Sequence, residues 1–226
     1  MNLNELYDVQ TVEVMKRTLR RDSSAIDVGA HGGTFLKEML AIAPDGHHLA
    51  FEPLPSMFSL LEAEYGQNAH VALFNVALSD TNGDVEFQHV MTNPAYSGLK
   101  KRRYDRADET VEAIRVRAAR LDDLVSKQQQ IRFMKIDVEG AELQILRGAV
   151  ETIARCKPAI VFEHGLGASD YYGTTPDQVY DLLVTDLGLE LYLMSDWLGR
   201  GGDKCLDRVG FCDEFYSGRN YYFLAA

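Results

Sequence analysis

The sequence predicts a doubly wound α/β domain, in which helices cover both faces of a mostly parallel sheet. In the first half of the chain, short apolar runs alternate with segments of helical periodicity, as in a β-α-β-α-β unit. The second half repeats this alternation. Because 46% of the 226 residues are apolar, the chain can bury one substantial core. We therefore expect a single domain over residues 1–226.

A helix is predicted ahead of the first strand, at about residues 4–21. Its apolar residues recur at steps of three or four and so share one helical face: Leu6, Val9, Val12, Met15 and Leu19. We expect this face to lie against the sheet.

The remaining elements follow from the same two periodicities. Five strands of the alternating pattern are predicted at 25–28, 48–52, 71–78, 132–138 and 159–163. The helices between and after them are predicted at 35–43, 56–65, 141–155 and 176–187. Two further strands, at 190–194 and 221–225, close the chain. Parallel strands need crossover helices, so ligands should bind at the carboxyl ends of these strands.

Residues 84–120 interrupt the alternation, and we interpret them as an insertion near the ligand-binding edge of the sheet. A hairpin is predicted around 85–90, followed by a polar stretch. Within it, residues 100–120 carry eight basic residues against four acidic ones, an excess of four positive charges. The basic residues are Lys100, Lys101, Arg102, Arg103, Arg106, Arg115, Arg117 and Arg120.

Composition excludes several classes of protein. A net charge of -11 and a pI near 5.0 disfavour binding to nucleic acid through the phosphate backbone. No basic stretch with a following apolar run begins the chain, and no apolar segment has the length of a membrane span. The three cysteines form no C-x-x-C pair. We therefore expect a cytoplasmic protein without a membrane span, a disulfide framework or a cysteine-based zinc site.

A glycine-rich turn follows the first predicted strand, in the run IDVGAHGG. Such a turn brings the backbone close to a ligand before the next helix begins. The pyrophosphate-binding fingerprint G-x-G-x-x-G is incomplete, because His31 occupies the position of its second glycine. Asp27, which precedes the turn, suits a cofactor that carries an ammonium group.

A carboxylate also follows the second predicted strand. Glu52 lies about twenty residues beyond the glycine turn, where it can accept hydrogen bonds from both ribose hydroxyls of a nucleoside cofactor. This position serves adenosylmethionine and NAD equally well.

Several segments together carry a family resemblance. IDVGAHGG, AFEPLP, NVALSD, FMKIDVEGAELQILRGA and IVFEHG resemble the FkbM family of S-adenosylmethionine-dependent, class I methyltransferases over about residues 25–165. The resemblance implies a Rossmann-like, seven-stranded sheet in the order 3-2-1-4-5-7-6, with the last strand antiparallel. It also implies methylation of an oxygen, with a hydroxyl of a sugar, glycoside or polyketide-type small molecule as the acceptor.

The same resemblance assigns residues to the cofactor. The glycine turn would line its methionine and ribose, Glu52 would hold the ribose, and the end of the third strand would border the adenine. The implied cofactor-binding residues are Asp27, Gly29, Ala30, His31, Gly33, Glu52, Ala77, Leu78, Ser79 and Asp137.

Four polar residues lie at or just beyond the carboxyl ends of the fourth and fifth predicted strands: Asp137, Glu139, Glu163 and His164. Asp137, Glu163 and His164 are the candidate catalytic residues. Methyl transfer needs positioning and removal of a proton from the acceptor hydroxyl, so His164 could act as the base. Alternatively, the three residues could bind a divalent metal such as magnesium. A third interpretation makes them structural groups that hydrogen-bond at the strand ends.

Two other functions stay open at this point. An NAD-linked oxidoreductase would share the fold and the ribose carboxylate, and a non-catalytic adenosylmethionine-binding module would share the cofactor pocket. The basic residues of the insertion indicate either an anionic acceptor, such as a phosphorylated sugar, or a solvated surface. The sequence leaves the oligomeric state open, a homo-oligomer included.

Overall fold

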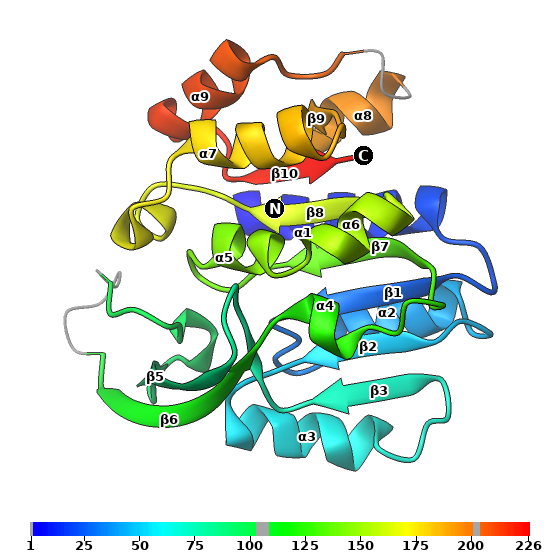
Figure 1. Cartoon of the computed structure of the whole chain (residues 1–226), viewed down its shortest axis with the longest axis vertical. Coiled ribbons are helices and arrows are strands. Elements are labelled where there is room, and N and C mark those ends of the chain that lie inside the picture. Colours follow the sequence, from blue (N-terminus) through cyan, green and yellow to red (C-terminus); the bar gives the residue numbers. More distant parts are fainter. Residues whose placement is uncertain (1, 103–108, 201–203) are drawn as a thin grey trace.

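The computed structural model describes residues 2–102, 109–200 and 204–226, the side chain of residue 200 excepted. Arg103 and Arg106, two members of the predicted basic group, lie outside the described residues. The described chain forms a seven-stranded sheet covered by helices and a separate three-stranded sheet (Figure 1).

The seven strands of the large sheet lie in the order β3-β2-β1-β7-β8-β10-β9. Their bounds are Val71–Phe74, His48–Phe51, Ser24–Val28, Ile131–Ile136, Ala159–Glu163, Tyr222–Ala225 and Leu191–Tyr192, respectively. The strands from β3 to β8 pair in parallel, whereas β10 is antiparallel to both β8 and β9. This confirms the predicted order and the predicted antiparallel last strand.

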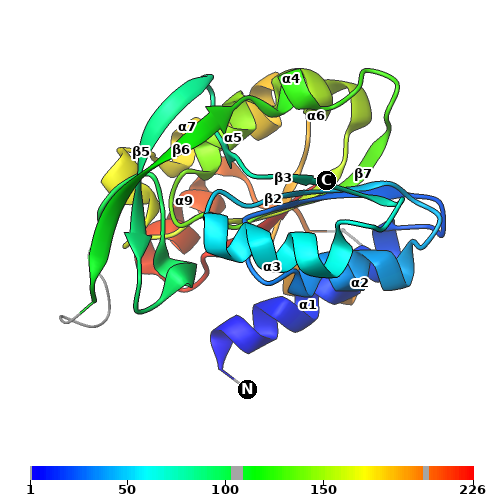
Figure 2. The same ribbon diagram turned by 90° about the horizontal axis from the view of Figure 1, so that it is seen from below.

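Helices cover both faces of this sheet (Figures 1 and 2). One face carries α1 (Leu3–Thr18), α2 (Thr34–Ile42) and α3 (Pro55–Tyr65), and the other carries α5 (Glu142–Arg147) and α6 (Val150–Cys156). Alternate residues of β1 point to opposite faces, and all residues from Ala25 to Val28 are buried. The central strands are therefore apolar almost throughout, as expected of a sheet covered on both sides.

The small sheet lies beyond the carboxyl ends of the parallel strands (Figure 1). It contains β4 (Ala77–Leu78), β5 (Gly83–Val90) and β6 (Val111–Ala119), in the order β4-β6-β5. The predicted hairpin around 85–90 is wrong in extent, because β5 is one strand and its antiparallel partner β6 begins twenty residues later. The short helix α4 (Leu121–Leu124) leads from β6 back to the large sheet.

Three predicted elements are each divided in the structure. The strand predicted at 71–78 comprises β3 and β4, which belong to different sheets. The helix predicted at 141–155 is interrupted at Gly148, where a Cβ atom would lie 2.0 Å from the Ser79 carbonyl oxygen. The helix predicted at 176–187 comprises α7 (Pro176–Tyr180) and a π-helical segment, Asp181–Asp186.

Other differences concern the ends and the last third of the chain. The first helix ends at Thr18, three residues before its predicted end. The helices α8 (Met194–Arg200) and α9 (Arg208–Ser217) were not predicted, because neither segment has a clear apolar periodicity. Two short 3-10 helices, Pro94–Tyr96 and Ser169–Tyr172, lie in the loops beyond the sheet.

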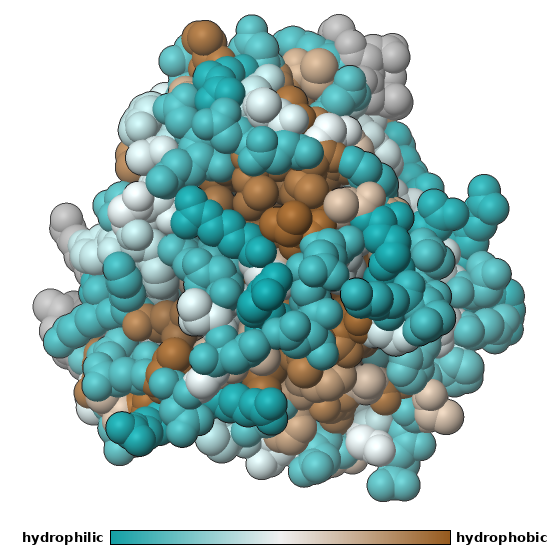
Figure 3. Space-filling model, viewed as in Figure 1, coloured by the Kyte–Doolittle hydropathy of each residue, from teal (hydrophilic) through white to brown (hydrophobic). Residues whose placement is uncertain are grey.

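The surface agrees with the acidic, polar composition. The face that carries α6 and α7 is mostly hydrophilic, with a hydrophobic area between these two helices and further ones in the lower part of the view (Figure 3). Among the described helices, none combines the length and the apolar composition of a membrane span. The three cysteines are free thiols.

Candidate active site

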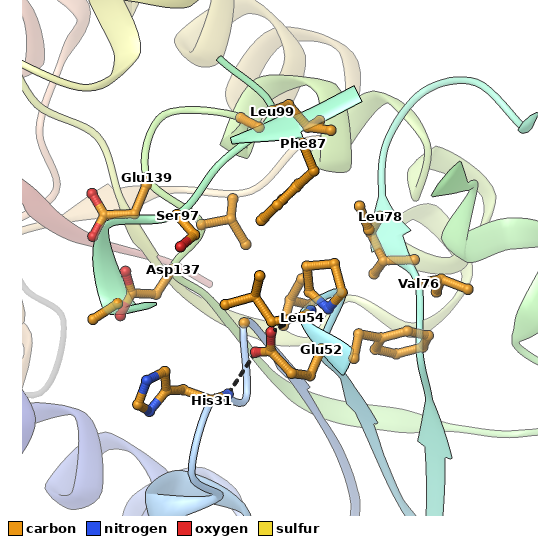
Figure 4. Close-up of a pocket in the computed structure, with 18 of the residues that line it drawn as sticks. His31, Glu52, Leu54, Val76, Leu78, Phe87, Ser97, Leu99, Asp137 and Glu139 are labelled. Atoms are coloured by element: carbon orange, nitrogen blue, oxygen red, sulfur yellow. Dashed lines mark hydrogen bonds between the residues drawn. The ribbon is translucent and has the colours of Figure 1, made fainter. Parts of the chain in front are cut away.

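A cavity opens at the carboxyl ends of β1, β2 and β7, where the sequence predicts ligand binding. Its volume is about 140 Å³. Asp137 and Glu139 lie on one side, Leu78 and Val76 lie on the other, and Glu52 lies between them (Figure 4). The cavity therefore has an acidic end and an apolar end.

Glu52 is fixed by the two loops that border it. One carboxylate oxygen accepts a hydrogen bond from the backbone N–H of His31 (2.8 Å) and the other accepts one from Leu54 (2.9 Å), as Figure 4 shows for His31. Burial raises the pKa of Glu52, and these two hydrogen bonds oppose the shift. A carboxylate has about four lone-pair sites, so Glu52 can accept two further hydrogen bonds from a ligand in the cavity.

The glycine turn brings the end of β1 against the end of β7. Gly29 has a φ of 74°, and a Cβ atom there would lie 2.1 Å from the Asp137 carbonyl oxygen. Glycine is thus required by the contact between two strand ends as well as by the turn. His31, with a φ of 47°, also has left-handed backbone geometry and directs its N–H toward Glu52.

Of the other predicted cofactor-binding residues, some line the cavity and some lie behind its lining. Ala77 and Leu78 line the cavity beside Phe87 of the insertion. The lining does not include Asp27, Ala30, Gly33 or Ser79. Asp27 and Ala30 are buried next to the turn, Gly33 begins α2 with a φ of 78°, and the N–H of Ser79 donates to Ala119.

Three carboxylates converge at the acidic end. One oxygen each of Asp137, Glu139 and Glu163 lies within 4.8 Å of the others. The sequence predicted all three at these strand ends, but it named only Asp137 and Glu163 of them as candidate catalytic or metal-binding residues. Such a cluster offers hydrogen-bond acceptors, and its donor atoms are also of the kind that binds a divalent metal.

Cations and burial give these carboxylates different acidities. Burial would raise the pKa of Asp137, but the Lys135 ammonium, 3.1 Å away, and hydrogen bonds from neighbouring groups hold it below its usual value. Burial and the nearby carboxylates raise the pKa of Glu163 well above its usual range. Burial also raises the pKa of Glu139, to about 8, although Arg102 forms an ion pair with it. Asp137 is therefore the most acidic group of the three.

Glu142 supports the turn that carries Glu139. Its carboxylate accepts hydrogen bonds from the backbone N–H groups of Gly140 (3.0 Å) and Val138 (3.4 Å). Both central residues of this turn have positive φ, 63° at Glu139 and 109° at Gly140. A Cβ atom at Gly140 would lie 2.6 Å from the Ala168 carbonyl oxygen, so the V-E-G sequence fits the close approach of the loop after β8.

The structure places His164 in an apolar environment, apart from the cavity lining and from the three carboxylates. Its ring is fully buried, stacks on Phe215 at a centroid distance of 4.6 Å and lies 5.9 Å from Phe211. Neither ring nitrogen has a hydrogen-bond partner among the described residues. Burial lowers the pKa of His164 to about 3. The predicted grouping of Asp137, Glu163 and His164 is therefore replaced by Asp137, Glu163 and Glu139.

The insertion closes one side of the cavity. Its segment 97–102, which we call the strap, contributes Ser97 and Leu99 to the lining. Arg102 pairs with Glu139, and the backbone N–H of Lys100 donates to the Tyr172 hydroxyl at 2.9 Å. The strap thus connects the insertion to the turn after β7 and to the loop after β8.

Lys135 is a site residue to which the sequence analysis gave no role. It is 3% exposed, lies 4.0 Å from an Asp27 oxygen as well as 3.1 Å from Asp137, and contacts the face of the Phe35 ring. A lysine between apolar residues in a central strand was the available signal, because such a residue is buried only with a partner.

Comparison with protein families identifies the chain. The model of the methyltransferase FkbM domain matches residues 27–191, which include the glycine turn, Glu52 and the three carboxylates. This chain belongs to the FkbM methyltransferase family. The prediction made from the motifs is therefore confirmed.

Relatives of this FkbM-family chain include much longer proteins. The AMB antimetabolite synthetase AmbE of Pseudomonas aeruginosa is 29% identical over an alignment that covers 90% of this chain and 12% of the synthetase. The 2-O-methyltransferase NoeI of Sinorhizobium fredii is 25% identical, over 60% of this chain and 61% of that protein. The chain thus spans a small part of the first relative and less than two thirds of the second.

Solved structures support the fold of this FkbM-family chain. The methyltransferase FkbM from Methylobacillus flagellatus superposes with a TM-score of 0.56 at 14% identity, over 92% of this chain and 44% of that one. Fibrillarin of Aeropyrum pernix, solved with natively bound S-adenosyl-L-methionine, gives 0.50 at 11% identity, over 97% and 74%. At such identities the similarity concerns the fold, so the exclusion of nucleic acid stays a prediction.

Proposed function

We propose that this chain is an S-adenosylmethionine-dependent O-methyltransferase whose acceptor is a hydroxyl of a sugar, glycoside or polyketide-type small molecule. The observation that carries the proposal is Glu52, a buried carboxylate that two backbone N–H groups fix between the apolar and acidic ends of one cavity. The cavity residues fit three parts of the cofactor: an apolar slot suits the adenine, Glu52 suits the ribose, and Asp137 suits the ammonium group.

The fit follows the length of the cavity. Val76, Leu78 and Phe87 provide an apolar slot for a flat adenine. Glu52 accepts the ribose hydroxyl hydrogens with its remaining lone pairs. At the other end, Asp137 is an ionised carboxylate at the cavity wall, suited to the cofactor's ammonium group. Gly29 keeps the turn between these groups flat against β7.

The chemistry requires positioning and the transfer of one proton. When bound, adenosylmethionine would supply a methyl group on a cationic sulfonium, so that a bond from the methyl carbon to the acceptor oxygen could form as the carbon–sulfur bond breaks, with neutral adenosylhomocysteine as the leaving group. The cavity walls fix the direction of attack, and carboxylates at the acidic end accept the proton of the acceptor hydroxyl. Glu163 does not line the cavity itself, but its carboxylate lies beside those of Asp137 and Glu139, which do, and it is our candidate for this base in place of the enclosed His164.

A metal at the acidic end is the alternative mechanism. Its ligands would be Asp137, Glu139 and Glu163, all oxygen donors of the kind magnesium prefers. Two of these carboxylates already have cationic partners, Asp137 with Lys135 and Glu139 with Arg102. These ion pairs favour the metal-free mechanism, because the two cations supply charge that a metal would otherwise bring.

The acceptor class is supported by the relatives. The family is one of methyltransferases, and a relative at 25% identity is named a 2-O-methyltransferase. The open acidic end supports a hydroxyl acceptor, because deprotonation of a hydroxyl needs a base that an already nucleophilic neutral amine does not. Oxygen is therefore the acceptor atom that the site serves best.

Calorimetric titration with adenosylmethionine, adenosylhomocysteine and NAD tests the cofactor. We expect micromolar binding of the first two and at least about a tenfold loss in Glu52→Ala, since a ligand hydroxyl loses a charged acceptor worth about 1.5–3 kcal/mol. Glu64→Ala, on the outer surface of α3, is the matched control. Preferential binding of NAD would replace the proposal with the oxidoreductase, and binding of none of the three would reject it.

The non-catalytic alternative needs a different measurement. Labelled methyl transfer from adenosylmethionine to pools of hydroxylated small molecules should give a labelled product that Glu163→Gln reduces by about 10²-fold or more, the usual contribution of a general base. Equal product yield with Glu163→Gln would remove Glu163 from the mechanism. Cofactor binding without any transfer would favour the binding module.

A further inference from the structure

Tyr172 connects the strap to the loop after β8. It is the last residue of the 3-10 helix Ser169–Tyr172, and its hydroxyl accepts a hydrogen bond from the backbone N–H of Lys100 at 2.9 Å. The Lys100 ammonium group also lies 5.3 Å from the centre of the Tyr172 ring, within the range of a cation–π contact. One half-buried tyrosine thus binds the strap through both its hydroxyl and its ring.

Two glycines make room for the Tyr172 ring. A Cβ atom at Gly140, in the turn that carries Glu139, would lie 2.8 Å from a ring carbon of Tyr172. A Cβ atom at Gly98, in the strap, would lie 3.2 Å from the Tyr172 hydroxyl oxygen and 3.7 Å from the Cβ atom of Glu139. The ring therefore packs against the backbone of the strap and against the backbone of the Glu139 turn.

The base of the strap is bound to its own insertion. Gln88 of β5 and Gly98 exchange two backbone hydrogen bonds, of 2.8 and 3.2 Å. The Ser97 hydroxyl accepts a further hydrogen bond from the backbone N–H of Val90 at 2.9 Å. Because these contacts lie within the insertion, they are independent of those that the other end of the strap makes with the loops of the large sheet.

Between its two ends, the strap covers the cavity. Leu99 and Phe87 lie on one side of the cavity, and His31 and Glu52 lie on the other (Figure 4). Leu99 packs against an apolar cluster that includes Leu54, whose backbone N–H donates to Glu52. A ligand bound at Glu52 would therefore lie under Leu99, and movement of the strap would uncover it.

We propose that the strap is a gate over the cofactor cavity and that Tyr172 is the positioning residue that holds it closed. The Tyr172 hydroxyl then sets the rates at which the cofactor enters and leaves. Tyr172 does not line the cavity, so it acts on the ligand through the strap. The inference rests on the proposed function for the identity of the ligand, whereas closure of the strap is a property of the chain itself.

A gate has a kinetic signature that a direct contact lacks. The strap of such a gate is closed most of the time with and without ligand, and the ligand exchanges through the open form. Weaker closure then raises the association and dissociation rates by the same factor and leaves Kd unchanged. Loss of a direct contact with the ligand mainly raises the dissociation rate, and Kd rises with it.

Tyr172→Phe isolates the hydroxyl. The variant keeps the ring between Gly98 and Gly140 and removes one neutral hydrogen bond, whose usual strength corresponds to about a threefold to tenfold change in an equilibrium. NMR line-shape analysis of adenosylhomocysteine titrations should show both rate constants raised by about this factor, with Kd within about twofold of the wild type. Tyr171→Phe removes the hydroxyl of the adjacent, exposed tyrosine and is the matched control, with unchanged rates expected.

Hydrogen exchange tests closure without any ligand. The Leu54 amide is buried beneath the strap and donates to Glu52, so it contacts neither of the substituted tyrosines through a hydrogen bond. Its exchange rate, measured relative to amides of β1 and β7 that report global unfolding, therefore reports opening of the strap. We expect Tyr172→Phe to raise this rate by about threefold to tenfold and Tyr171→Phe to leave it unchanged.

A reversible cross-link makes the opposite change. The Cβ atoms of Gly98→Cys and Glu139→Cys would lie 3.7 Å apart, a separation that suits a disulfide. The pair is introduced together with Tyr172→Phe, and the partly accessible Cys205 and Cys212 are replaced by serine. Oxidation should lower both rate constants for adenosylhomocysteine by at least about tenfold, and reduction should restore the fast exchange.

The possible results separate the gate from its alternatives. Rate constants in Tyr172→Phe equal to those in Tyr171→Phe, or a formed disulfide that leaves ligand exchange unchanged, would overturn the proposal. A raised Kd with an unchanged association rate would also reject the gate, in favour of a direct contact. Absence of adenosylhomocysteine binding in every sample, wild type included, would reject the proposed function, and the Leu54 amide would still decide whether Tyr172 closes the strap.

Discussion

Lys135 of β7 and Asp137, the first residue after that strand, form an ion pair between a buried and a half-buried side chain, with 3.1 Å between the ammonium nitrogen and a carboxylate oxygen. Residues i and i+2 of a strand share one face, so both side chains point to the side of the sheet that α1 and α2 cover. Asp27, paired in register with Lys135 on β1, adds a second carboxylate. One lysine thus balances two acids, of which Asp137 lines the cavity.

Replacing this lysine should destabilise the fold. Lys135→Met leaves the buried Asp27 and the half-buried Asp137 without their cation, so we expect the free energy of unfolding to fall by about 3–5 kcal/mol, the usual effect of breaking a buried pair. Urea denaturation at neutral pH measures the change. Lys16→Met, which removes an exposed pair with Glu13, is the control and should change the midpoint little. A similar shift in both variants would contradict the role of Lys135.

The glycine turn offers a matched pair of substitutions. Gly29→Ala places a Cβ atom 2.1 Å from the Asp137 carbonyl oxygen at a positive φ, so we expect a loss of at least about 2 kcal/mol. Gly32→Ala meets no atom within 4 Å and should change stability by less than about 0.5 kcal/mol. Urea denaturation of both variants shows whether glycine is needed because of the contact between the ends of β1 and β7 or at any position of the turn.

We predict that the buried His164 makes the stability of the protein depend on pH. Its pKa is about 3 in the folded protein and about 6.5 in an unfolded chain. The unfolded state therefore binds a proton that the folded state does not, and stability is lost as the pH falls from about 6.5 toward 3. By linkage, His164 costs the fold about 2 kcal/mol at pH 5 relative to pH 7.5.

The variant His164→Phe should remove this loss while preserving the stacking on Phe215. We expect its stability relative to the wild type to rise by about 2 kcal/mol between pH 7.5 and pH 5, measured by denaturation at each pH. The exposed His47→Gln serves as the control and should follow the wild type. An unchanged difference between His164→Phe and the wild type would mean that the His164 ring becomes protonated in the folded state.

Metal removal tests the alternative mechanism. Because Lys135 and Arg102 already pair with the carboxylates, we expect chelator to leave cofactor binding unchanged. Addition of about 1 mM magnesium should move the thermal midpoint by less than about 1 °C, since a ligand stabilises the fold only as it binds. A shift of several degrees that Glu163→Gln abolishes would favour the metal.

Much of the fold and half of the site followed from local sequence. Strands of the large sheet could be predicted because buried parallel strands are short continuous apolar runs, and the motifs at their ends placed Gly29, Glu52 and Asp137 at one edge. The carboxyl ends of parallel strands meet at that edge regardless of the conformation of the loops. A residue's position at the end of a predicted strand was therefore sufficient to place it near the cavity.

Glu163 and His164 show the limit of that argument. The two residues are adjacent at the end of β8, and from the sequence both were candidate catalytic residues. Glu163 lies with the other carboxylates, whereas His164 points to the opposite side and is covered by Phe211 and Phe215 of α9. The aromatic cover comes from a helix without apolar periodicity some fifty residues later, so only its packing in the tertiary structure decided which side chain is enclosed.

The charge of the site was decided in the same way. The sequence contains eight basic residues in the insertion and determined the chain's acidity, and its family resemblance predicted the strand order. Whether a given arginine meets a ligand depends on its register across β5 and β6 and on the closure of the strap onto Glu139. Those contacts join residues far apart in the chain, and electrostatic interactions depend on distance in space, so the tertiary structure alone assigned them.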